Sequence, residues 1–171
     1  MTLANIVTIV RIFFIPLVVF FLSQESYLFS LIFVLLFFLG DLLDGYLART
    51  RNEITQLGQF LDPMADKLLA FSLMVAFAMI GQLSWWTVWL LFIPNLLLTL
   101  GSVVLFQKGK ATVPARWSGK IAATVLALGL TLMYLQILFE WTLFANIFIY
   151  IGIGLAYWAV IDYIQIGMKQ S

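Results

Sequence analysis

Apolar residues fill the chain in six long runs that short polar segments separate. The runs cover residues 3–23, 27–49, 60–81, 85–106, 116–139 and 142–167. A helix needs about 20 apolar residues to cross the hydrocarbon core of a bilayer, and every run has a length of that order. The pattern therefore predicts an all-α, polytopic membrane protein with six transmembrane helices, forming a single domain over residues 1–171.

The composition also requires a lipid environment. Of the 171 residues, 64% are hydrophobic and only 10% are charged, whereas soluble domains carry roughly 25% charged residues. The polar side chains are too few to cover a water-exposed surface, which excludes a disordered chain, a secreted disulfide scaffold and a nucleic-acid-binding module. Because Arg11 lies inside the first run and no small-residue cleavage site accompanies it, we expect a retained helix and not a cleaved signal peptide.

The basic residues predict the orientation in the membrane. With six spans, the two termini and the second and fourth connections share one side, and all nine basic residues lie on or near that side: Arg11, Arg49, Arg51, Lys67, Lys108, Lys110, Arg116, Lys120 and Lys169. The opposite connections contain only Glu25 and Glu140 as charges. The excess of Lys and Arg marks cytoplasmic loops, so we expect both termini in the cytoplasm. Tryptophans would then form an outer aromatic belt, with Trp85, Trp86, Trp89 and Trp141, and an inner one at Trp117.

The chain contains neither cysteine nor histidine. This excludes disulfides, thiolate nucleophiles, zinc sites built on Cys or His, and every catalytic triad that uses an imidazole. Chemistry is left to carboxylates, Lys, Arg, Tyr and hydroxyl groups. A metal would be bound through oxygen, which favours Mg²⁺, Mn²⁺ or Ca²⁺.

Four of the eight acidic residues are aspartates at the end of the second run and around the start of the third. They are Asp41, Asp44, Asp62 and Asp66. The first pair shares a helix stripe with Gly45 and Ala48, and the second pair, four residues apart, shares a face of the next helix. Asp62–Pro63 has the residue types of an N-cap and a first-turn proline, so we expect the third helix to begin there.

Four carboxylates that face one another below the lipid headgroups need to be neutralised, because even one acidic residue at a bilayer centre costs about 2.5–3.5 kcal/mol. Protonation, as in a proton relay, is one solution, and divalent cations are the other. Gly45 and Ala48 leave room for a ligand, while Arg49 and Lys67 add donors suited to phosphate oxygens. These parts favour metal-assisted phosphoryl transfer. A small proton- or cation-coupled transporter is the alternative from a different class.

The same stretch resembles the signature of the CDP-alcohol phosphatidyltransferase family. The pattern D-x₂-D-G-x₂-A-R-x₈-G-x₃-D-x₃-D is met by Asp41, Asp44, Gly45, Ala48, Arg49, Gly58, Asp62 and Asp66. The resemblance implies the fold of that family, a homodimer, and an active site on the cytoplasmic side. It also implies transfer of a phosphatidyl group from CDP-diacylglycerol to an alcohol, with release of CMP.

The resemblance assigns a role to each matched position. It implies that the four aspartates bind one or two divalent ions, Mg²⁺ or Mn²⁺, and that Asp66 also takes the proton of the acceptor. Gly45, Ala48 and Gly58 would line the pocket for the cytidine and the diphosphate. Arg49 would contact the diphosphate.

The acceptor is less sharply defined. The segment Asn5 to Arg11, followed by Pro16, is similar to the N-x-x-T-x-x-R-x₄-P opening of phosphatidylglycerophosphate synthases and CMP-forming cardiolipin synthases. We therefore expect glycerol 3-phosphate as acceptor, giving phosphatidylglycerophosphate, with phosphatidylglycerol, giving cardiolipin, as the alternative. Pro94–Asn95 stands where those enzymes usually have Arg and an acidic residue, and Ala122 and Ala123 replace a basic residue and a threonine. Candidate acceptor-binding residues are Lys120, Arg116, Lys108, Lys110 and Arg11, the last of which we expect near the acceptor or a carboxylate.

Overall fold

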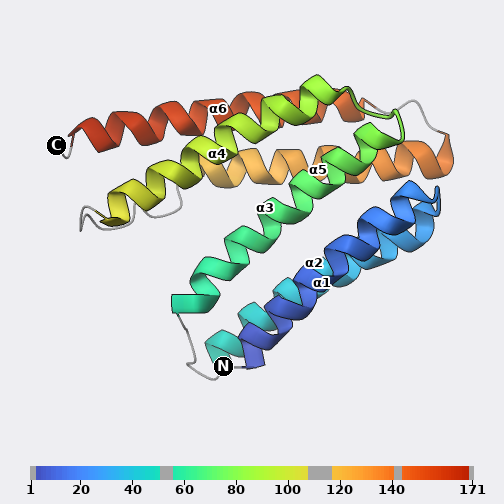
Figure 1. Cartoon of the computed structure of the whole chain (residues 1–171), viewed down its shortest axis with the longest axis horizontal. Coiled ribbons are helices and arrows are strands. Elements are labelled where there is room, and N and C mark those ends of the chain that lie inside the picture. The colour runs from blue at the N-terminus through green and yellow to red at the C-terminus, as the bar shows by residue number, and fades with distance from the viewer. Residues whose placement is uncertain (1–2, 51–55, 108–116, 141–143, 170–171) are drawn as a thin grey trace. The chain divides into compact units, whose positions relative to one another are not determined.

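The structure is a computed structural model that describes residues 3–50, 56–107, 117–140 and 144–169, and its regular structure is entirely helical (Figure 1). The helices are α1 (Leu3–Ser23), α2 (Tyr27–Thr50), α3 (Gln56–Met79), α4 (Trp85–Gln107), α5 (Trp117–Phe139) and α6 (Ala145–Lys169). The prediction of six helices in an all-α fold is confirmed, and the limits of the six apolar runs lie within four residues of the observed helix ends.

Several of these helices have the length and composition of membrane spans. Ile6–Ser23 in α1, Trp117–Phe139 in α5 and Ala145–Asp162 in α6 are long and apolar enough to cross a membrane. Tyr27–Leu43 in α2 and Trp85–Leu97 in α4 are shorter apolar stretches of the described residues. Large hydrophobic side chains are exposed along these helices, as expected where the solvent is lipid.

One boundary prediction is wrong. We expected Asp62–Pro63 to begin the third helix, but α3 begins earlier, at Gln56, so both residues lie inside it. Proline in a helix removes one backbone hydrogen bond. Membrane helices tolerate that loss because neighbouring groups and small local adjustments satisfy the freed carbonyl. An isolated Asp-Pro pair is therefore a weak start signal in an apolar chain.

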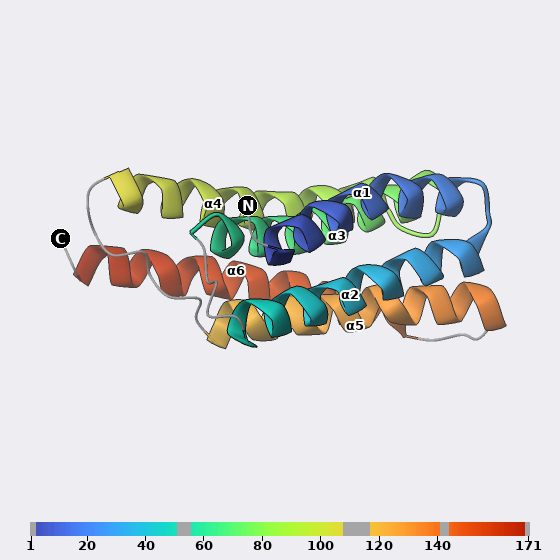
Figure 2. The same cartoon turned by 90° about the horizontal axis from the view of Figure 1, so that it is seen from below.

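The helices fall into two compact units, Met1–Leu83 and Ser84–Ser171. In the first unit, α1 packs against both α2 and α3, and α2 runs back alongside α1 (Figures 1 and 2). Its core includes Val18, Leu22, Phe37 and Phe77, which are fully buried. Because α1 touches both neighbours, a side chain on α1 can contact α2 and α3 together.

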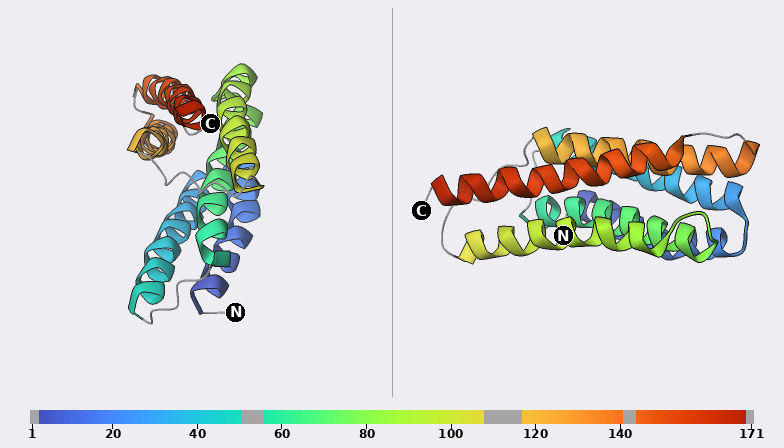
Figure 3. Two further views of the ribbon diagram at one scale, coloured as in Figure 1. Left: turned by 90° about the vertical axis from the view of Figure 1, so that its left-hand side faces the viewer. Right: turned by 90° about the horizontal axis from the view of Figure 1, so that it is seen from above.

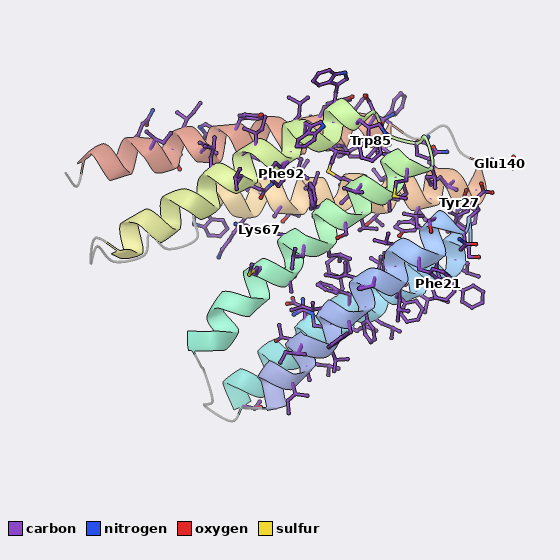
Figure 4. The ribbon with its side chains drawn as sticks, viewed as in Figure 1. Phe21, Tyr27, Lys67, Trp85, Phe92 and Glu140 are labelled. Carbon is purple, nitrogen blue, oxygen red and sulfur yellow. The ribbon has the colours of Figure 1, made fainter. Side chains whose placement is uncertain are left out.

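The turn from α1 to α2 is defined by a helix C-cap. Glu25 adopts a left-handed conformation with a φ of 57°. Its N–H donates to the carbonyl of Leu22 at 3.1 Å, and the N–H of Ser26 donates to the carbonyl of Phe21 at 2.9 Å. These are the two hydrogen bonds of a Schellman motif, which ends a helix and reverses the chain. Figure 4 shows Phe21 and Tyr27 at this end of the unit.

In the second unit, α6 packs against α5 and α4 (Figure 3). The approach of α5 and α6 depends on glycine. A Cβ added at Gly129 would lie 2.8 Å from Cγ1 and 2.9 Å from the backbone nitrogen of Ile149, and one at Gly152 would lie 3.0 Å from the backbone nitrogen of Leu126. Small residues allow membrane helices to pack with their backbones in contact. At the start of α4, Trp85, Trp86 and Trp89 are exposed, as the aromatic belt requires; Trp141 lies outside the described residues.

Candidate functional site

The centre of the candidate site is Arg11, which projects from α1 toward two carboxylates. Its Nη1 lies 3.0 Å from Oδ1 of Asp41 on α2, and its Nη2 lies 3.0 Å from Oδ1 of Asp66 on α3. Adjacent nitrogens of one guanidinium therefore bind both carboxylates. Because the guanidinium is a rigid planar fork, this arrangement fixes where the two oxygen atoms lie relative to each other.

The rest of the guanidinium is held by α2. Nε of Arg11 donates to the carbonyl of Phe37 at 3.1 Å, and the Cζ atom lies 4.4 Å from the centroid of the Phe37 ring. Only 1% of the Arg11 side chain is exposed, whereas Asp41 and Asp66 are 41% and 54% exposed. The arginine is therefore sealed between helices, and the two carboxylates extend from it toward a more open region.

Gly40 makes room for this arginine. A Cβ at Gly40 would lie 2.7 Å from Cγ and 2.9 Å from Cδ of Arg11, which is closer than real Cβ atoms approach. Both atoms belong to the middle of the side chain, whose head group has three polar contacts. The glycine is therefore required for the aliphatic part of Arg11 to cross α2 next to Asp41.

The two aspartates lie at similar distances along their helices from the ends that the chain connects. At a rise of 1.5 Å per residue, Asp41 lies roughly 14 Å before the end of α2 at Thr50, and Asp66 lies roughly 15 Å after the start of α3 at Gln56. Only five residues separate those two helix ends in the chain. Both aspartates are thus about equally far from the helix ends at Thr50 and Gln56.

The structure brings together part of the predicted residue set. Asp41, Asp66 and Arg11 meet, and Gly45 lies on the same helix as Asp41, one turn further on. The remaining predicted positions fall outside the described side chains: Asp44, Ala48, Arg49, Gly58, Asp62, Lys108, Lys110 and Arg116. Their assigned roles stay predictions.

The donor set suits a hard divalent cation. Asp41 and Asp66 offer carboxylate oxygens from two helices, and the chain has no His or Cys to offer a softer ligand. Oxygen ligands are those that Mg²⁺ and Mn²⁺ prefer. Among the side chains that the structure describes, no three acidic groups gather at one point.

Lys120 belongs to the second unit. It lies on α5, and its Nζ is 5.7 Å from the centroid of the Trp117 ring, which is 80% exposed. Nearby on the same helix, the hydroxyl of Ser118 donates to Oδ2 of Asp162 on α6 at 3.1 Å. Asn95, at one of the positions that depart from the family pattern, donates to the carbonyl of Leu91 at 3.0 Å. This amide is thus occupied with the backbone of its own helix.

Sequence reasoning missed two residues of the site, Gly40 and Phe37. Gly40 directly precedes the first aspartate, but a lone glycine in an apolar helix carries no distinctive signal. Phe37 lies one helical turn before Asp41 and is one of many phenylalanines in the chain. Neither could be found without knowing that Arg11 crosses α2 at that point.

A model of the family described as CDP-alcohol phosphatidyltransferase matches residues 1–158. The chain belongs to this family. The match covers all of α1 to α5 and just over half of α6. A CDP-alcohol phosphatidyltransferase is a membrane-bound enzyme, so the family confirms the predicted enzyme class and the membrane location of the fold. It also favours an enzyme over the transporter alternative.

Curated relatives refine the comparison. The chain is 32% identical over 174 residues to the CDP-diacylglycerol–glycerol-3-phosphate 3-phosphatidyltransferase of Haemophilus influenzae, covering 93% of this chain and 89% of that protein. It is 37% identical over 82 residues to the enzyme of the same name from Aquifex aeolicus, covering 48% of this chain and 46%, about half, of that protein. A Mycobacterium bovis protein provisionally named a cardiolipin synthase is 28% identical over 123 residues, covering 71% of this chain and 59% of that protein.

Proposed function

We propose that this CDP-alcohol phosphatidyltransferase transfers the phosphatidyl group of CDP-diacylglycerol to glycerol 3-phosphate, forming phosphatidylglycerophosphate and CMP in phospholipid biosynthesis. The observation that carries the proposal is the meeting of Asp41 and Asp66 on one guanidinium, because these are the first and the last aspartates of the matched motif. Relatives named for this activity support the choice of acceptor.

The proposed reaction is an in-line substitution at phosphorus. A hydroxyl oxygen of the acceptor attacks the phosphorus that bears diacylglycerol, and the bond from that phosphorus to the bridging diphosphate oxygen breaks. CMP leaves with the electron pair of that bond, and the carboxylate of Asp66 takes the proton of the hydroxyl. Such reactions depend mainly on positioning and on stabilisation of charge.

Each proposed role uses the chemistry of a particular side chain. Asp41 and Asp66, with Asp44 and Asp62, would hold Mg²⁺ or Mn²⁺, and a bound divalent ion neutralises diphosphate charge. Arg49 would bind a diphosphate oxygen, while Gly45, Ala48 and Gly58 would leave space for the cytidine. With no histidine in the chain, a carboxylate is the available base.

Phosphatidylglycerol is the second candidate acceptor, and a specific observation favours it. Asn95 donates to the carbonyl of Leu91 and is uncharged, and Ala122 and Ala123 carry no polar group, so three positions provide no charge for an acceptor phosphate. Lys120, with Lys108, Lys110 and Arg116, would have to bind the phosphate of glycerol 3-phosphate instead. A phosphatidylglycerol acceptor requires no such pocket.

An acceptor panel tests both candidates. Purified protein in detergent is given CDP-diacylglycerol, Mg²⁺ or Mn²⁺, and one acceptor at a time, and both CMP and the lipid product are measured. Product with glycerol 3-phosphate supports the first proposal, and product with phosphatidylglycerol alone replaces it with the second. Two results would count against both candidates: CMP released without transfer to any acceptor in the panel, and no release of CMP at all. EDTA should abolish turnover, and either ion should restore it.

The sidedness and the assembly complete the proposal. The distribution of Lys and Arg supports a site and both termini on the cytoplasmic side, where the soluble nucleotide and acceptor are found. A homodimer follows from the family resemblance, and mass measurement of the detergent-solubilised protein tests it.

A further inference from the structure

Arg11 is the largest fully buried side chain of the described residues, and it lies in a helix that contributes nothing to the aspartate motif. A buried charge within a membrane helix is costly and needs partners. Arg11 has partners on both neighbouring helices, namely Asp41 and the Phe37 carbonyl on α2 and Asp66 on α3. One residue of α1 thus connects the two halves of the motif.

The geometry of these contacts depends on arginine specifically. Nε, Nη1 and Nη2 each point at a different acceptor, and the aliphatic stem occupies the space that Gly40 leaves. A lysine has the same charge, but its ammonium is a single point that cannot reproduce the planar fork. With 1% of its side chain exposed, Arg11 is also fixed in place before any substrate arrives.

We propose that Arg11 is a positioning residue that holds Asp41 and Asp66 side by side and balances their charge when no divalent ion is bound. The inference rests on the proposed function, since it gives those two carboxylates their purpose. In this role Arg11 acts through the carboxylates and does not contact the acceptor. A residue of α1 thereby keeps the carboxylates of α2 and α3 in the relative positions that catalysis requires.

The first experiment measures thermal unfolding of the purified protein, without substrate, in EDTA and in excess Mg²⁺. In Arg11→Met the two carboxylates lose their counter-charge, so unfolding in EDTA should occur at a lower temperature than in the wild type. The gain in midpoint on adding Mg²⁺ should be at least about twice the wild-type gain, because the ion then relieves uncompensated negative charge. An equal gain in both proteins, or no gain in either, would overturn the proposal.

A second variant disturbs Arg11 without changing any charge. Gly40→Ala places a methyl group against Cγ and Cδ of Arg11 and should enlarge the Mg²⁺-dependent gain in the same direction. Gly154→Ala is the matched control, because a Cβ there meets nothing within 4 Å, and its gain should equal that of the wild type. If Arg11→Met does not fold, Gly40→Ala decides the question. A Mg²⁺-dependent rise in its unfolding midpoint equal to that of the wild type would refute the positioning role.

Kinetics of Arg11→Lys separate positioning from acceptor binding. Positioning predicts a loss of kcat of about tenfold or more per folded molecule, with KM for the acceptor within about twofold of the wild type. A raised acceptor KM with unchanged kcat would assign Arg11 to the acceptor and overturn the inference. The unfolding data need no substrate, so an enlarged Mg²⁺ response in an enzyme that accepts no alcohol would refute the proposed function alone.

Discussion

Replacing Asp66 by asparagine tests the base and the fold separately. Asn has the shape of Asp and keeps an oxygen at the position where Nη2 of Arg11 donates at 3.0 Å. It cannot take up a proton from an acceptor hydroxyl, and it is a poor ligand for a divalent ion. The substitution therefore removes the proposed chemistry and leaves the contact with α1 in place.

The two effects differ greatly in size. Loss of a general base costs about 100- to 10,000-fold in turnover. The structural cost is the difference between a charge-assisted and a neutral hydrogen bond, which is about 1 kcal/mol or less here because water screens a side chain that is 54% exposed. For a chain of this size, a loss of 1 kcal/mol lowers the unfolding midpoint by about 2–4 °C.

The assay combines CMP release with thermal unfolding of the same preparation. We expect Asp66→Asn to lose nearly all turnover while its unfolding midpoint shifts by only a few degrees. Glu25→Gln is the control, because it makes the same chemical change in the exposed turn after α1 and should leave both quantities at wild-type values. Turnover within about threefold of the wild type in Asp66→Asn would refute its role as the base.

Other expectations concern packing, backbone and topology. Gly129→Ala should destabilise the contact of α5 with α6 by about 1–3 kcal/mol, whereas Gly154→Ala, with open space around its Cβ, should not lower the unfolding midpoint. Gly81→Ala should lower the free energy of unfolding by about 1–2 kcal/mol although its Cβ meets nothing, because the φ of Gly81 is +76°. Thermal unfolding measures all three variants. Because the chain has no cysteine, Gln24→Cys and Thr50→Cys are single reporters. A membrane-impermeant maleimide should label Gln24→Cys on sealed cells and Thr50→Cys only after permeabilisation, and the reverse pattern would invert the proposed topology.

The helices were predictable because, in an apolar chain, the length of each apolar run determines whether it can form a membrane-spanning helix. Each run long enough to span a bilayer became a helix, and turns formed where residues 24–26 and 82–84 interrupt the runs. The start of α3 was not predictable from Asp62–Pro63, because the six preceding residues, from Gln56 onward, also form a helix. Polar composition marks the end of an apolar run, and this end need not coincide with the end of the helix.

The site was predictable only as a list of residue types at fixed spacings. Spacing indicated that Asp41 and Asp66 belong to one site, but it did not show which group would connect them. Arg11 lies 30 residues from Asp41 and 55 from Asp66 in the chain, so no local pattern joins them. The close approach of Gly40 to the arginine stem is equally invisible, because it depends on how α1 crosses α2.

The contacts of Arg11 also explain how an acidic motif is tolerated in helices of this composition. Insertion of each carboxylate costs several kcal/mol on its own, yet the arginine shares its charge between the first and the last aspartate of the motif. The opening segment that ends at Arg11 and the aspartate motif are thus two sequence patterns within one electrostatic unit. It follows that exchanging Arg11 and Asp66 for an uncharged pair should cost less stability than removing Arg11 alone, because the single change leaves two carboxylates without their counter-charge and the double change leaves only Asp41. A double-mutant cycle of Arg11→Met and Asp66→Asn, followed by thermal unfolding in EDTA, measures this coupling, and strictly additive effects would show that the two side chains do not depend on each other.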